Sequence, residues 1–404
     1  MKGEYAHLDW DLAYLSKDGK TYELDLVTLQ VKESDKHFDE PIVLAETSTD
    51  RTIDVGQTID FVSCDRQERF DNRYVRSLII IPTWACSARC TYCYVAKVRE
   101  DTVMLTADKV EEALEKYKID PRKIRGTIFI GGDPVENLDA VEYCIDKFEN
   151  ANHTVCTGFV GDDATIERLL DIVMFNPKVE ISLSLDPPES GRYKFDQTYN
   201  RNIMWLETFK KFIGKRIRVK STLNANAYKI SELRKVVPEG THISFDGAGY
   251  GFGKIKNVER HILDGIKKEF DIELQEVIDG KPILDSYFSF HRSAIDMING
   301  EQRGQTCSCG MEYFTLLPSG DLSYCDSPER PILDENLNHP ELSLKMEGKK
   351  PCGGGGICDT CQYQRFCGGS CGITKQHELY CYVKILDFVY SAYLNLFGVL
   401  DEHS

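Results

Sequence analysis

Apolar strand-like runs alternate with helical segments between residues 76 and 290, and this alternation constrains the fold more than any other feature of the chain. The runs lie at 77–84, 126–130, 153–160, 179–185, 216–224 and 241–245. The helical segment after Thr106 combines a capping residue with apolar residues spaced for one helix face. Six β/α units predict a parallel sheet with right-handed crossovers. Because eight units close a full barrel, we expect an α/β fold built on an open, partial (β/α)6 barrel.

Two further regions flank the predicted barrel. Residues 1–75 indicate a small β-rich region, because Asp18 and Gly19 form a hairpin-turn pair between alternating apolar residues. A sheet extension and a docking module for a partner both fit this region. Residues 300–404 contain the Cys- and Gly-rich run 351–372, which needs metal to hold it together. We therefore expect three domains: 1–75, 76–290 and a Cys-rich domain at 300–404.

Cysteine is concentrated in two clusters. Of the 15 cysteines, three lie at 86–93 and nine at 307–381, while Cys64, Cys144 and Cys156 stand apart and are interpreted as core thiols. The first residues lack the apolar core of a signal peptide, which favours a cytoplasmic protein. In the reducing cytoplasm, dense cysteine points to metal binding or catalysis rather than to disulfides. We therefore expect metal centres at both clusters.

The composition argues against two kinds of partner. The formal net charge of −16 is unsuited to nucleic acid, which requires a basic face on the protein. No apolar run approaches the roughly 20 residues that cross a bilayer, so we expect no membrane partner either. The acidic balance instead favours a substrate with a basic segment.

Cys86, Cys90 and Cys93 follow the first strand-like run, at the sheet edge where β/α barrels place their active sites. Their C-x3-C-x2-C spacing lets one tight loop surround a cuboidal [4Fe–4S] cluster, for which thiolates are suitable soft ligands. Three ligands leave one iron open to a small molecule. A zinc site is the alternative interpretation of the same residues.

These three cysteines, with the aromatic Tyr94 directly after them, resemble the signature of radical S-adenosylmethionine (SAM) enzymes. The resemblance implies that the amine and carboxylate of SAM chelate the open iron. It also implies that reductive cleavage of SAM gives a 5′-deoxyadenosyl radical, which abstracts hydrogen from the substrate. Tyr94 is then expected beside this cofactor.

Two later segments add to the resemblance. The segment "GGDP" at 131–134 is similar to the Gly-Gly-Glu segment that contacts the SAM amine in this family, with Gly131 and Gly132 allowing close approach. Asp133 replaces the usual Glu and is one methylene shorter. The segment "SLSLDPP" at 182–188 resembles the family's Ser-x-Asp segment, which implies that Ser184 and Asp186 bind ribose or the methionine carboxylate. Ordinary turns are the alternative for both segments, and no residue is identified as the general base.

The C-terminal cysteines resemble the seven-cysteine SPASM extension that a subset of radical SAM enzymes carries. The resemblance implies two auxiliary [4Fe–4S] clusters, and hence three clusters in total. One would be held by Cys309, Cys325 and Cys371, and the other by Cys358, Cys361, Cys367 and Cys381. The first set is one ligand short; we favour Cys307 for the vacant position, with Cys352 and an open iron as the alternatives.

The SPASM subset acts mainly on peptides, so the resemblance implies an oxidoreductase with a peptide or protein substrate. Our leading hypothesis is a maturase of a ribosomally made peptide that forms a thioether or a carbon–carbon cross-link. Its low-potential chemistry implies a flavodoxin or ferredoxin as reductant. The alternatives are an anaerobic sulfatase-maturing enzyme, which forms formylglycine, and a peptide epimerase. From a different class, an iron–sulfur electron carrier also fits the cysteines.

Overall fold

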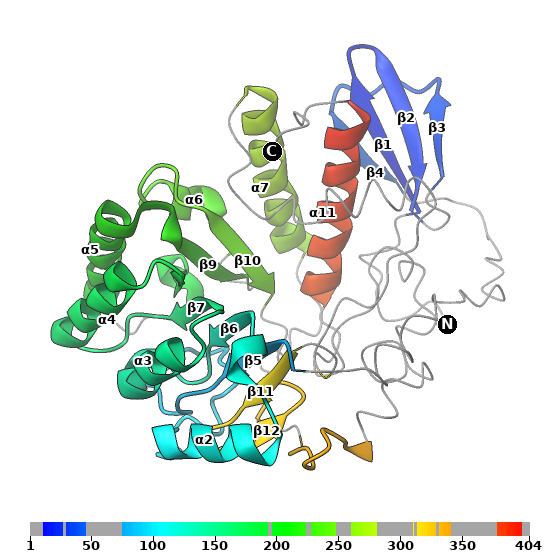
Figure 1. Cartoon of the computed structure of the whole chain (residues 1–404). Coiled ribbons are helices and arrows are strands. Elements are labelled where there is room, and N and C mark those ends of the chain that lie inside the picture. The colour runs from blue at the N-terminus through cyan, green and yellow to red at the C-terminus, as the bar shows by residue number, and fades with distance from the viewer. Residues whose placement is uncertain are drawn as a thin grey trace. The chain divides into compact units, whose positions relative to one another are not determined.

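The computed structural model (Figure 1) describes residues 11–26, 30–45, 75–192, 196–223, 228–247, 260–280, 310, 313–328, 331–340 and 378–397. The chain divides into two compact units, one of residues 1–63, 254–306 and 350–404 and one of residues 64–253 and 307–349. Among the described residues, no helix combines the length and apolar character that a bilayer crossing requires.

The first unit contains a four-stranded antiparallel sheet in the order β3-β2-β1-β4. The strands are β1 Leu12–Lys17, β2 Lys20–Asp25, β3 Val31–Ser34 and β4 Ile42–Ala45. Asp18 and Gly19 form a two-residue turn between β1 and β2, and both have left-handed backbone conformations, with φ of 52° and 77°. A turn of this kind matches the twist of a hairpin, so the predicted hairpin is confirmed.

Two long helices complete the described part of this unit, α7 Arg260–Ile278 and α11 Glu378–Leu396. Figure 1 shows α7 (light green) and α11 (red) side by side. The Phe270 and Tyr390 rings pack with centroids 5.1 Å apart, and the Tyr382 hydroxyl donates to the Leu263 carbonyl at 3.0 Å. Aromatic burial and this buried hydrogen bond therefore join the two helices.

The second unit is built on an eight-stranded sheet in the order β10-β9-β8-β7-β6-β5-β11-β12. From β5 to β10 each strand pairs in parallel with the next one along the chain. These strands are β5 Ser77–Ile80, β6 Gly126–Phe129, β7 Asn152–Thr157, β8 Val179–Ser184, β9 Ile217–Leu223 and β10 Ile243–Gly247. Each overlaps one predicted run, which confirms the partial (β/α)6 barrel.

Helices connect these parallel strands. They are α2 Ala107–Lys116, α3 Leu138–Lys147, α4 Asp163–Phe175, α5 Asp196–Ile213 and α6 Ile230–Arg234, with single 3-10 turns at Pro121–Lys123, Pro134–Asn137, Pro188–Ser190 and Gly214–Arg216. Side chains of Thr106, Asn137 and Asp162 cap the first turns of α2, α3 and α4. The predicted cap at Thr106 is therefore confirmed.

The strands β11 Tyr313–Leu316 and β12 Leu322–Ser323 extend the same sheet beyond β5. β11 runs parallel to β5, and β12 pairs with β11 in antiparallel register. Pairing with β11 satisfies the backbone groups that β5 would otherwise expose at an open edge. Residues that the sequence placed in the Cys-rich domain thus contribute to the barrel sheet.

Candidate functional site

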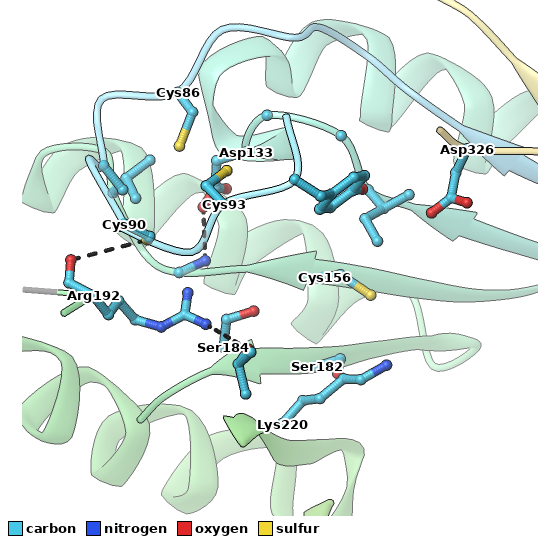
Figure 2. Close-up of a pocket in the computed structure, with 18 of the residues that line it drawn as sticks. Cys86, Cys90, Cys93, Asp133, Cys156, Ser182, Ser184, Arg192, Lys220 and Asp326 are labelled. Carbon is cyan, nitrogen blue, oxygen red and sulfur yellow. Dashed lines mark hydrogen bonds between the residues drawn. The ribbon is translucent and has the colours of Figure 1, made fainter. Parts of the chain in front are cut away.

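A cavity of about 440 Å³ lies inside the partial barrel, a volume typical of small-molecule and cofactor sites. Alternate residues of β5 to β10 line it, together with the loops that follow β5, β6, β7 and β8. The structure brings to this cavity eight of the nine residues predicted to bind the first cluster and SAM: Cys86, Cys90, Cys93, Tyr94, Gly131, Gly132, Asp133 and Ser184. Figure 2 shows the three thiols gathered at one side of it.

The loop that carries the three cysteines is held by its neighbours. The Thr91 amide donates to the Gly191 carbonyl at 3.1 Å, and the Ser87 amide donates to Glu136 Oε1 at 3.1 Å. Behind the loop, Trp84 is buried against Ile81 and Val95, and Cys93 and Tyr94 pack on the same cluster. Backbone bonds and apolar packing therefore fix where the thiols lie.

Gly131 and Gly132 allow the loop after β6 to lie directly against the cysteine loop. The Gly132 amide donates to the Thr83 carbonyl at 3.0 Å, and a Cβ on Gly132 would lie 2.0 Å from the Ala85 carbonyl oxygen. Gly131 has a φ of 133°, which side chains rarely tolerate, and its Cβ would meet Ile81 at 2.5 Å. The two glycines thus approach the chain's own backbone closely while they also line the cavity.

Asp133 links the ends of β6 and β7. Its carboxylate accepts from the Thr157 hydroxyl and the Gly158 amide, both at 2.7 Å, and from the Val135 amide at 3.2 Å. Burial raises the pKa of Asp133 to about 6, although the bonds from Gly158 and Thr157 act in the opposite direction. Both oxygens of the residue that replaces Glu therefore have partners within the chain.

Asp186, the ninth predicted residue, is fully buried and lies outside the cavity lining. One of its oxygens accepts from the Tyr92 hydroxyl and from Arg192 Nε at 2.7 Å. The other accepts from the Ser221 hydroxyl at 3.1 Å and from the Thr222 amide at 2.6 Å. Asp186 thus links three parts of the chain: the cysteine loop, the loop that follows β8, and strand β9.

Arg192 is a site residue that the sequence analysis missed. Its guanidinium is held by Asp186 and by the Thr222 hydroxyl at 3.3 Å, and its own carbonyl faces the Cys90 thiol at 3.9 Å. The backbone at Gly191 passes so close to Thr91 that a Cβ there would lie 2.4 Å from the threonine hydroxyl. The motif "SLSLDPP" gave no signal for a cation six residues after its aspartate.

The cavity wall also contains residues that the sequence analysis did not assign to it. Cys144 is buried as expected of a core thiol, whereas Cys156 faces the cavity from β7, so its interpretation as a core thiol is wrong. Arg218 and Lys220 line the cavity from β9. Their alternation with apolar residues in "RIRVK" is the signal that could have found them.

Most of the predicted auxiliary ligands lie outside the described residues: Cys307, Cys309, Cys358, Cys361, Cys367 and Cys371. Cys381 belongs to α11, but its side chain is not among those described. Cys325 is buried just after β12, next to Asp326, which lines the cavity. The auxiliary clusters therefore stay a prediction.

The chemistry of the three thiols fits a cluster. Burial raises the pKa of Cys86 to about 12, with a further contribution from the charge of Asp133, and burial also raises the pKa of Cys90. Such thiols ionise when a metal binds them, so metal binding would release their protons. Within the described ranges no three His, Cys, Asp or Glu side chains are placed to hold a single metal ion. A cuboidal cluster takes each thiolate on a different iron.

Comparisons with known proteins identify relatives of this fold. Residues 80–236 match the model of the Radical SAM superfamily, and no curated protein matches the chain. The structure of native anSMEcpe with bound AdoMet and Cp18Cys peptide is similar over 80% of this chain and 98% of that chain, with a TM-score of 0.56 and 18% identity. Streptococcus suis SuiB bound to precursor peptide SuiA is similar over 90% and 94%, with a TM-score of 0.52 and 14% identity. At these identities the similarity shows a shared fold.

Proposed function

Because residues 80–236 place this chain in the radical SAM superfamily, we propose that it is a maturase that cross-links a ribosomally made peptide through a thioether or a carbon–carbon bond. One observation carries the proposal. The same cavity of the partial barrel is lined by Cys86, Cys90 and Cys93 and by Gly131 and Gly132. A peptide substrate is supported by the similarity to structures that hold peptides, anSMEcpe with Cp18Cys and SuiB with SuiA.

The residues at the cavity fit the two cofactors of this superfamily. Cys86, Cys90 and Cys93 would hold a [4Fe–4S] cluster, while the backbone of Gly131 and Gly132 and the Ser184 hydroxyl would contact SAM. When bound, this pair supplies a 5′-deoxyadenosyl radical that abstracts hydrogen. The chain itself fixes the cysteine loop through Asp186 and keeps the surrounding wall in place. The substrate peptide would lose one hydrogen atom to this radical and then one proton and one electron. The product is therefore lighter by two hydrogen atoms.

The predicted auxiliary clusters provide the acceptor for that electron in this proposal. They belong to the Cys-rich domain 300–404, with Cys307, Cys309, Cys325 and Cys371 as one ligand set. Cys358, Cys361, Cys367 and Cys381 form the other, which brings the total to three clusters. A flavodoxin or ferredoxin would reduce the cluster at Cys86–Cys93, and a cytoplasmic location would keep the thiols reduced.

The proposal is tested by anaerobic turnover of the reconstituted protein with a reductant, SAM and a peptide encoded next to its gene. We expect 5′-deoxyadenosine and a peptide that is lighter by two hydrogen atoms. A thioether product will have lost one free thiol and one carbon–hydrogen bond, and a carbon–carbon product will have lost two carbon–hydrogen bonds. Replacing Cys90 by Ala should abolish both products. The matched control, Cys144→Ala on α3, removes a buried thiol outside the cavity and should retain them. An unchanged peptide mass with every neighbouring peptide would contradict the proposal.

The same experiment separates the alternatives. A sulfatase-maturing enzyme, favoured by the fold similarity to anSMEcpe, would convert a sulfatase-derived peptide to an aldehyde that reacts with hydrazides. A peptide epimerase would leave the mass unchanged in water and incorporate deuterium from heavy water. An iron–sulfur electron carrier would show the cluster spectra without forming 5′-deoxyadenosine.

A further inference from the structure

The wall that β9 contributes to the cavity is basic. Arg218, Lys220 and Thr222 line the cavity, whereas Val219 and Ser221 between them are buried on the opposite face of the strand. Residues two apart on a strand lie about 6–7 Å apart, so the two cations are neighbours on one surface. This basic wall occurs in a chain whose formal net charge is −16.

Arg192, the third cation of the lining, has a different environment. Its guanidinium is bonded to the buried Asp186 carboxylate at 2.7 Å and lies beside the cysteine loop. Thr222, which also bonds Arg192, marks this end of β9, and Lys220 and Arg218 follow in the direction away from it. Figure 2 shows Lys220 extending beside Ser182, on the side of the cavity away from Cys90.

The acidic residues of the lining lie on other elements. Both carboxylate oxygens of Asp133 accept hydrogen bonds, one from Thr157 and the other from Gly158, at the end of β7. Asp326 lies beside Cys325. The strands on either side of β9 present Ser182 and Ser244 to the cavity, which are small and uncharged. Within the described part of the chain, the Arg218 guanidinium has no carboxylate partner. A guanidinium fork matches a carboxylate in a two-point contact, and a neighbouring ammonium adds to the attraction.

We propose that Arg218 and Lys220 bind a carboxylate of the substrate peptide at the end of the cavity away from the cysteine loop. This inference rests on the proposed peptide substrate and names a chemical class for it: a peptide whose reacting segment carries an Asp or Glu side chain or a C-terminal carboxylate. It differs from the basic substrate segment that the net charge favours. Net charge acts on the approach of a substrate over a distance, whereas the two side chains act on the group inside the cavity.

The proposal is tested by binding, without turnover, to the anaerobically reconstituted full-length protein with SAM. The probes are acetyl-Gly-Glu-Gly-amide, its neutral analogue acetyl-Gly-Gln-Gly-amide, and acetyl-triglycine with either a free carboxylate or an amide at its C-terminus. Saturation-transfer NMR gives their dissociation constants. We expect a carboxylate probe to bind about tenfold more tightly than its amide partner, and the preference to weaken as salt is added. The Glu probe and the free triglycine then identify whether the carboxylate comes from a side chain or from the chain end.

Variants at Arg218 show whether the basic wall is responsible. Arg218→Gln should abolish the preference, Arg218→Lys should retain part of it, and Arg218→Glu, which places a carboxylate beside the Lys220 ammonium, should abolish it as well. Lys220→Gln should weaken it as well. The control Lys215→Gln removes an exposed cation just before β9 and should leave the preference intact. Circular dichroism and iron content verify that each variant is folded and loaded.

Equal binding of both carboxylate probes and their respective amide partners to the unchanged protein would overturn the inference. So would a preference that survives both Arg218→Gln and Lys220→Gln. Because binding is measured directly, these outcomes differ from failure of the proposed function, which is the absence of 5′-deoxyadenosine or of a modified peptide.

Discussion

At the scale of single residues, Asp186 explains how a short loop can hold three thiols in a defined place. Its buried carboxylate receives a hydrogen bond from Tyr92 on the cysteine loop, an ion pair from Arg192, and bonds from Ser221 and Thr222 on β9. Four donors on two oxygens satisfy a group whose burial would otherwise be very costly. Asp186 thereby adds a side-chain attachment of the cysteine loop to the barrel, beside the backbone bonds and apolar packing described above.

Replacing Asp186 by Asn should therefore destabilise the whole barrel. The amide keeps the shape of the side chain but removes its charge and directs an N–H group at existing donors. Arg192 is then left largely buried without its counter-ion, and breaking a pair of this kind costs about 3–5 kcal/mol of unfolding free energy. Urea denaturation followed by circular dichroism measures the loss.

The matched control for this variant is Asp163→Asn, which makes the same chemical change at an exposed ion pair with Arg201. Solvent screens this pair, so its denaturation midpoint should change much less. If Asp186→Asn and Asp163→Asn had the same midpoint, Asp186 would not be the attachment point that its contacts indicate.

At the scale of elements, the site depends on two loops that lie in direct backbone contact. The Asp133 amide donates to the Ala85 carbonyl at 3.0 Å, so the loop after β6 continues the hydrogen bonding of the β5–β6 pair toward the cysteines. Only a residue without a side chain fits at Gly132, because the Trp84 and Ala85 carbonyl groups occupy the space that a Cβ needs. A shift of the glycine loop would therefore also shift the loop that carries the thiols.

A Gly132→Ala variant should displace the cysteine loop. Its Cβ would lie 2.0 Å from the Ala85 carbonyl oxygen, and neither backbone can move without breaking the bonds between the loops. We expect less iron per protein after anaerobic reconstitution and a lower denaturation midpoint. Gly126→Ala on β6 is the control, because its Cβ meets only the Ser77 side chain, at 3.3 Å. Full iron loading of Gly132→Ala would show that the loops are more compliant than their contacts indicate.

Local signals in the sequence were sufficient to predict the main elements. The six parallel strands, the hairpin at Asp18 and the helix cap at Thr106 all depend on residues near one another in the chain, and the structure confirms them. β11 was missed because a four-residue strand is defined by its partner, which here lies more than 200 residues earlier in the chain. The basic wall of β9 was missed because the alternation in "RIRVK" shows which residues share a face of the strand and does not show which face lines the cavity.

For the site, the sequence predicted which residues lie near the cavity but not which of their atoms are available to a ligand. The resemblance of its motifs to those of radical SAM enzymes identified the cysteines and glycines that the cavity brings together. It also suggested cofactor contacts for Asp133 and Asp186, whose oxygens the structure pairs with groups of the chain itself. A motif indicates which residues lie near a site, whereas hydrogen-bond partners from distant strands decide which atoms remain available to a ligand.

At the scale of the whole molecule, a distant part of the sequence completes the barrel that holds the site. Residues 313–328 return to the sheet and bring Asp326 to the cavity and Cys325 to its neighbourhood. Lys116 pairs with Asp321 at 2.8 Å, and the buried Tyr117 hydroxyl accepts from the Leu322 amide at 3.1 Å and donates to the Leu333 carbonyl at 3.3 Å. The end of α2 is therefore the attachment point for this segment.

Tyr117→Phe tests this attachment, because it removes the hydroxyl and leaves the ring in place. The Leu322 amide would lose its partner in a buried position, which costs about 1–3 kcal/mol. Amide hydrogen exchange should become faster in β11 and β12 and stay unchanged in β7 and β8. The control is Tyr143→Phe, whose exposed hydroxyl bonds Glu111 on the surface and whose loss should alter neither region. Equal exchange rates at β12 in the two variants would mean that the pairing of β11 with β5 is sufficient to hold β11 and β12 in place. The position of Asp326 at the cavity would then not depend on α2.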